Sequence, residues 1–307
     1  MAKKKNSKDR VRRRRGESGS GNLHPTGILK SFAAVCAVGA VVLGIVYWDR
    51  MIKETGSASE DTVTLEIRAV PAWVNEALKE KLSAVARADG IGLQLDDAVA
   101  GRVQRNIQEL FAWLDGATVR TMHDRLVVEG RWRKPVVFVK QGLESFYVDG
   151  DLVVLDFVEM PHLTITNVQG LTPPPAGPGR EGPALGQVWQ RDDLAAAVEL
   201  VELLGEWDRQ KTPDKPLLDE IAAVDVSNYD GRTNSRSPHI LFYTTDNTEV
   251  IWGAEPGKWQ RHLEADDAEK LAKLYAYYKE HGTLLGEVKY INLRDPQDKI
   301  HLPIDKY

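Results

Sequence analysis

The sequence FAWLDGATVRTMHDRLVVEGRWRKPVVFV, residues 111–139, decides the fold because the hydrophobic period changes within it. A helix enters this stretch, and it is predicted by apolar residues at helical spacing: Val103, Ile107, Leu110, Phe111 and Leu114. We expect that helix to end at Asp115-Gly116. Short strands follow at residues 118–122 and 126–132, and the apolar run PVVFVK at 135–140 begins a strand-rich region.

Upstream of this stretch, the chain predicts one strand and one more helix. Val63, Leu65 and Ile67 alternate with polar residues, as in a half-buried strand. The helix is predicted by a second apolar face: Val74, Leu78, Leu82 and Val85. Residues 63–134 therefore have the predicted order strand, helix, helix, strand, strand, which is typical of a small α+β module.

Residues 135–307 are predicted to form a mixed, strand-rich domain with two helices. Asp149-Gly150 and Asp246-Asn247 are turn signals between short apolar runs, so each predicts a hairpin. The other elements are two helices and two strands, predicted from Leu194, Val198 and Val201; from Leu271, Leu274, Tyr275 and Tyr278; and at Ile221–Val226 and Val288–Leu293. The expected fold class is α+β.

The N-terminal part of the chain predicts a membrane anchor. Residues 31–48 carry no charge, and with Ile28 and Leu29 they supply the roughly 20 apolar residues that cross a bilayer. We place a single transmembrane helix at Ile28–Trp48, after a basic tail (1–27) and before a linker (49–62). Ten of the 40 Lys and Arg residues fall within the first 30 positions. The positive-inside rule therefore puts the tail in the cytoplasm and the C-terminal domains outside the inner membrane.

Three other interpretations of this N-terminal region remain open. A cleaved signal peptide is one, since Ser57-Ala58-Ser59 offers small residues for cleavage, although a signal-peptide core usually spans only about 7–15 residues. A buried core helix is less consistent with a run that has no polar face. The basic tail could bind nucleic acid, but orientation in the membrane with some affinity for anionic lipid is the simpler explanation, so we expect no nucleic-acid partner.

The sequence gives no positive sign of catalysis or of a cofactor. The only cysteine, Cys36, lies in the predicted membrane helix, so the exported part has no thiol ligand and no disulfide. No two histidines stand at helical ligand spacing among His24, His123, His162, His239, His262, His281 and His301. We therefore expect no metal, no cofactor, no small-molecule substrate and no enzymatic activity.

The arrangement of these segments resembles the FtsQ/DivIB cell-division proteins. Residues 111–139 resemble that family's passage from a POTRA domain into its β domain, including the Arg-x-Pro junction at 133–135. FYVDGDLVVLD, MPHLTITNVQG, AVDVSN, TEVIWG, KLAKLYAYY and YINLRDP keep the family's order toward the C-terminus. The resemblance implies a POTRA-like domain at 63–134 and a β domain at 135–307.

The resemblance also implies a scaffold located at midcell. Proteins of this family bind the small bitopic FtsB/DivIC and FtsL proteins, and a partner segment adds as a strand at an exposed edge near the last β-strands. The corresponding contacts here would lie within residues 290–302: Tyr290, Asn292, Arg294, Lys299 and His301. Two other interpretations remain: an ordinary edge strand, and a POTRA-containing factor for envelope assembly or export unrelated to division.

Overall fold

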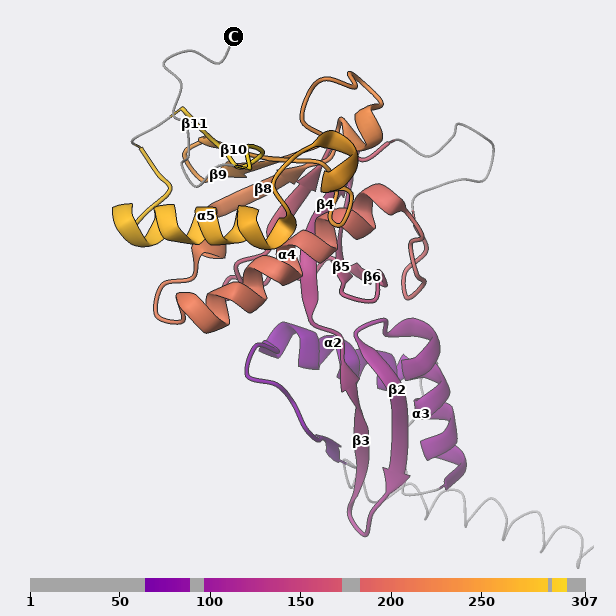
Figure 1. Ribbon diagram of the computed structural model, residues 1–307. Helices are drawn as coiled ribbons and strands as arrows, with labels where there is room; N and C mark the ends of the chain where they lie inside the picture. Colours follow the sequence, from indigo (N-terminus) through magenta and orange to yellow (C-terminus); the bar gives the residue numbers. More distant parts are fainter. Residues whose placement is uncertain (1–63, 89–96, 173–182, 287–288, 297–307) are drawn as a thin grey trace, which may run out of the picture. The chain divides into compact units, whose positions relative to one another are not determined.

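A computed structural model describes residues 64–88, 97–172, 183–286 and 289–296 (Figure 1). The chain divides into two units, residues 1–62 and 63–307, and all described residues belong to the second. The predicted tail, the membrane helix Ile28–Trp48 and the linker lie outside the described residues. Within the described ranges, no helix is long and apolar enough to span a bilayer.

The first elements form a three-stranded sheet with two helices. They are β1 (Thr64–Ile67), α2 (Glu76–Ala86), α3 (Asp97–Leu110), β2 (Leu114–Thr121) and β3 (Arg125–Trp132). The central strand β3 runs parallel to β1 and antiparallel to β2. Leu78 and Leu82 of α2 pack with Val103 and Ile107 of α3 in one apolar cluster, and all four are fully buried. The predicted order strand, helix, helix, strand, strand is confirmed.

An eight-stranded mixed sheet follows, in the order β11-β10-β9-β8-β7-β4-β5-β6. Its strands are β4 (Pro135–Gln141), β5 (Glu144–Asp149), β6 (Val154–Asp156), β7 (Thr166–Gln169), β8 (Ile221–Asp225), β9 (Ile240–Thr244), β10 (Glu249–Gly253) and β11 (Tyr290–Asn292). The pairs β4–β7, β7–β8 and β10–β11 are parallel, and the other neighbours are antiparallel. Both predicted hairpins are present, as β5–β6 and β9–β10.

Helices α4 (Asp192–Lys211) and α5 (Asp267–His281) lie across the eight-stranded sheet (Figure 1). Leu204 of α4 and Leu274 of α5 pack in one apolar cluster with Phe242, Val250 and Trp252 of the sheet, and none of these side chains is exposed. Three short 3₁₀ helices, η2 (Leu217–Glu220), η3 (Tyr229–Gly231) and η4 (Trp259–His262), connect these elements. The expected α+β class and the two helices of the strand-rich region are confirmed.

One local prediction was wrong, and one strand was not predicted. The second helix ends at Leu110, not at Asp115-Gly116, because Leu114 already begins β2. Gly116, with a φ of +60°, lies where the register between β2 and β3 shifts, so the Asp-Gly pair forms a bulge within a strand. Strand β7 was not predicted, because a four-residue strand between parallel neighbours gives little periodic signal.

Candidate functional site

Strand β11 lies at one end of the eight-stranded sheet, and it pairs only with β10 among the described residues. Glu249 N–H donates to Lys289 O at 3.3 Å, and Leu293 N–H donates to Ile251 O at 3.0 Å. Because backbone groups alternate in direction along a strand, the N–H and C=O of Asn292 face away from β10. This outer side of β11, at Asn292, is called the open edge below.

Of the five predicted contact residues, three lie in the described part of the chain. Tyr290 is buried, and Asn292 is half-buried and accepts the Arg294 N–H at 3.0 Å through its side chain. Arg294 is also half-buried, and its Nε donates to Glu264 Oε1 at 2.7 Å. Lys299 and His301 lie outside the described residues. The predicted role of these residues in binding stays a prediction.

Glu264 holds the segment after β11 against the body of the domain. It accepts the Ala254 N–H, and Lys270 donates to it at 2.8 Å from a fully buried position on α5. Burial acts to raise the pKa of the Glu264 carboxyl, but the Ala254 N–H, Lys270 and Arg294 outweigh burial and lower that pKa. Glu264 is therefore a buried carboxylate that fixes Arg294, so this arginine has a structural partner already.

The opposite end of the sheet is closed by the chain itself. Val154 N–H donates to Gln187 O at 3.0 Å, and Gly186 N–H donates to Val154 O at 2.8 Å. Trp189 N–H also donates to Leu152 O at 2.8 Å. The segment 186–189 thus occupies the outer side of β6, whereas no described segment pairs along the open edge.

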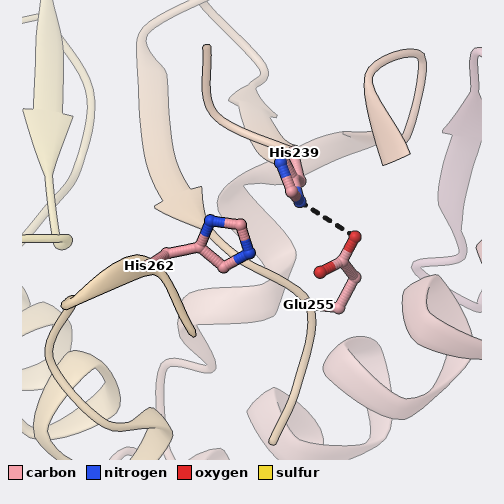
Figure 2. A group of neighbouring side chains, drawn as sticks. All are labelled: His239, Glu255 and His262. Atoms are coloured by element: carbon pink, nitrogen blue, oxygen red, sulfur yellow. Dashed lines mark hydrogen bonds and ion pairs between the residues drawn. The ribbon is translucent and has the colours of Figure 1, made fainter. Parts of the chain in front are cut away.

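Three potential metal ligands meet at the end of the β9–β10 hairpin away from its turn (Figure 2). His239 precedes β9, Glu255 follows β10, and His262 ends η4. His239 Nδ1 lies 2.9 Å from Glu255 Oε1, and the two imidazole rings meet edge to face with centroids 4.6 Å apart. These residues are called the histidine cluster below.

The histidine cluster was not predicted, because its three residues do not stand at helical ligand spacing. A different signal was present: His239 and Glu255 flank the two strands of a predicted hairpin. Residues just outside two paired strands are neighbours, and the backbone N–H of His239 donates to the backbone carbonyl of Gly253 at 3.0 Å. His262 gave no such signal, because its position depends on the fold of the chain after β10.

A cavity of about 740 Å³ is lined by charged residues of both signs. Glu199 and Glu202 of α4 face it, together with Arg131, Arg133 and Arg209. Burial raises the pKa of both glutamates. No serine, cysteine or histidine lines this cavity in the part of the chain that is described. The expectation that the protein is not an enzyme stays a prediction.

No family model matches the chain, and no curated protein matches it.

Proposed function

We propose that this protein is a non-catalytic, single-pass scaffold of the bacterial cell-division machinery, with its C-terminal domains outside the inner membrane. Its partners would be bitopic proteins similar to FtsB/DivIC and FtsL, and its position would be midcell. The proposal also takes residues 63–134 as a POTRA-like domain, 135–307 as the β domain and 28–48 as the membrane span. The resemblance in sequence supports a role in cell division, and the open edge supports binding by addition of a strand.

The open edge is the single observation that carries the binding mode. Asn292 directs an N–H and a C=O outward at the end of a sheet whose other end is closed by residues 186–189. Unpaired backbone groups on an edge strand are a template for an added strand, and they provide affinity without demanding a particular sequence. A partner segment would bind there as a ninth strand.

Two variants at one position separate backbone from side-chain recognition. Asn292→Pro removes the outward N–H but no ladder bond to β10, whereas Asn292→Ala keeps the N–H and removes only the side chain. Each full-length variant is expressed in place of the natural protein, solubilised from membranes and purified with its partners. We expect Asn292→Pro to recover bitopic division proteins at least about tenfold less well, and Asn292→Ala to recover them normally.

Three outcomes would contradict the proposal. Equal recovery by the proline and alanine variants would remove the strand-addition mode. Wild-type protein that brings down no division protein, together with normal septation after loss of the gene, would remove the division role. Recovery of outer-membrane assembly or export proteins instead would favour an envelope-assembly factor. A fluorescent fusion imaged for midcell position gives an independent reading.

A further inference from the structure

Glu255 has a buried oxygen whose surroundings need an explanation. The residue is only 2% exposed, and its Oε1 accepts the Asp230 N–H at 2.6 Å and contacts His239 Nδ1 at 2.9 Å. Its Oε2 is buried and has no hydrogen-bond partner among the described residues. A buried carboxylate oxygen without a partner is costly, and an ion that is not part of the structure is one of the few arrangements that satisfy it.

We propose that His239, Glu255 and His262 bind a divalent transition-metal ion of the zinc class. Two imidazoles and one carboxylate are ligands that Zn²⁺ accepts, and three protein ligands leave one position for water or another donor. Hard ions such as Mg²⁺ and Ca²⁺ prefer oxygen ligands alone, so the two histidines argue against them. The inference does not depend on the proposed role in division.

The spacing of the cluster fits a site that closes slightly when the ion binds. One ligand atom from each residue lies within 4.8 Å of the other two. Bonds of about 2.0–2.1 Å would bring tetrahedral ligands to roughly 3.3 Å apart. His239 and Glu255 are buried and already in contact, whereas His262 is exposed and its side chain has room to rotate. Figure 2 shows both rings and the carboxylate converging on one region.

The nearby Lys258 does not satisfy the free oxygen of Glu255. Lys258 interacts electrostatically with Glu255, but its Nζ lies over the Tyr229 ring, 3.4 Å from the hydroxyl. Glu255 Oε2 therefore has no lysine partner among the described residues.

A metal-free His239–Glu255 pair is the competing explanation. It accounts for the bond at Oε1, because a histidine Nδ1–H donates readily to a carboxylate. It leaves Oε2 without a partner among the described residues. An ion bound to all three residues would give Oε2 a partner, and His262 already meets His239 edge to face. Such an ion would tie η4 to the β9–β10 hairpin.

The test measures zinc bound by the full-length chain in detergent micelles. Chelator-treated protein is dialysed against a low concentration of ZnCl₂, and retained zinc is measured by atomic emission. Wild type is expected to retain one equivalent more than His262→Ala, in which only an exposed ligand is removed. His123→Ala, which removes an exposed histidine outside the cluster, should retain as much as wild type. Co²⁺ absorption and the increase in Tm with zinc, roughly 5 °C for a site near saturation, follow the same pattern.

Equal zinc content in wild type and His262→Ala would overturn the site, as would an equal loss from His123→Ala. Glu255→Gln provides a second variant, which should lose the same equivalent because a neutral amide is a weaker ligand than a carboxylate. If Glu255→Gln keeps the equivalent while the protein remains folded, Glu255 only orients His239 and the proposed ligand set is wrong.

Discussion

The two end strands of the eight-stranded sheet differ in how their outer backbone groups are paired. At the β6 end, residues 186–189 hydrogen-bond to the outer side of the strand, so both backbone groups of Val154 are paired within the chain. At the β11 end, the ladder runs only to β10 within the described residues. Unpaired backbone groups at a sheet end are a template for pairing with another chain, and among the described residues only the β11 end offers them along the outer side that the proposal uses.

The ends also differ in what holds them in place. Leu155 of β6 is fully buried in an apolar cluster, and the neighbouring Asp156 accepts the Trp113 indole N–H at 3.1 Å. The β11 end is held instead by Glu264, which joins the backbone after β10 to Lys270 and Arg294. A charged network fixes the direction of the chain after β11 without covering the open edge.

The largest expected effect comes from removing Glu264. Glu264→Ala leaves Lys270, which is fully buried, without its carboxylate partner. Breaking a buried pair by removing one member typically costs about 3–5 kcal/mol, so we expect a loss of that size in the free energy of unfolding. Denaturant unfolding of the full chain in micelles, followed by tryptophan fluorescence, measures it.

The control for that prediction is Glu76→Ala, which removes an exposed helix pair with Lys79. Its cost should be near 0.5 kcal/mol, as is common for helix-surface ion pairs. If both variants lose stability equally, then Glu264 does not hold the β11 end and the contrast between the two ends fails.

Proline substitutions at Val154 and at Asn292 test whether the backbone N–H at each position is paired. Val154→Pro removes the N–H that donates to Gln187 O, whereas Asn292→Pro removes an N–H with no described partner strand. Relative to alanine at the same position, proline at Val154 should cost about 0.5–1.5 kcal/mol more, because the hydrogen bond to Gln187 O is lost. Proline at Asn292 should cost less than about 0.5 kcal/mol more than alanine. Equal extra costs at both positions would show that the β11 end is also closed.

Most of the fold could be predicted because its signals are local. The turn pairs Asp149-Gly150 and Asp246-Asn247 each lie between apolar runs. Asp266 caps α5, which begins at Asp267, by accepting the Glu269 N–H at 2.7 Å. The boundary of α3 was wrong because Gly116 could end a helix or form a bulge, and only the pairing with β3 decides which. Strand β7 could not be predicted, because it is fixed by pairing with β4 and β8, which lie far from it in sequence.

The functional groups could be predicted only in part. The edge position of the last strand followed from the family resemblance, and the structure places β11 at an end of the sheet within the described residues. That Arg294 is bound by Glu264 could not be foreseen, because the two are 30 residues apart and no periodic pattern connects them. His262 meets His239 and Glu255 only because of the tertiary fold, so the spacing of these residues in the sequence does not predict their contact.

The smallest expected effect is a local opening of the β11 end in acid. The pKa of Glu264 is lowered in the folded chain from its ordinary value of 4.5, so its contribution to stability is complete above that pH. As the pH falls through the lowered pKa that Glu264 has in the folded chain, protonation weakens the bonds to Ala254, Lys270 and Arg294, and that contribution is lost.

We therefore expect the Leu293 amide, which donates to Ile251 O, to lose hydrogen-exchange protection below about pH 4.5, after correction for the intrinsic exchange rate. The Val154 amide at the closed end is not held by Glu264 and should keep its protection until global unfolding. In Glu264→Gln the Leu293 amide should exchange faster at neutral pH and respond less to acid. If the two amides lose protection together in the wild type, the ends open as one cooperative unit, and Glu264 is not a separate control of the open edge.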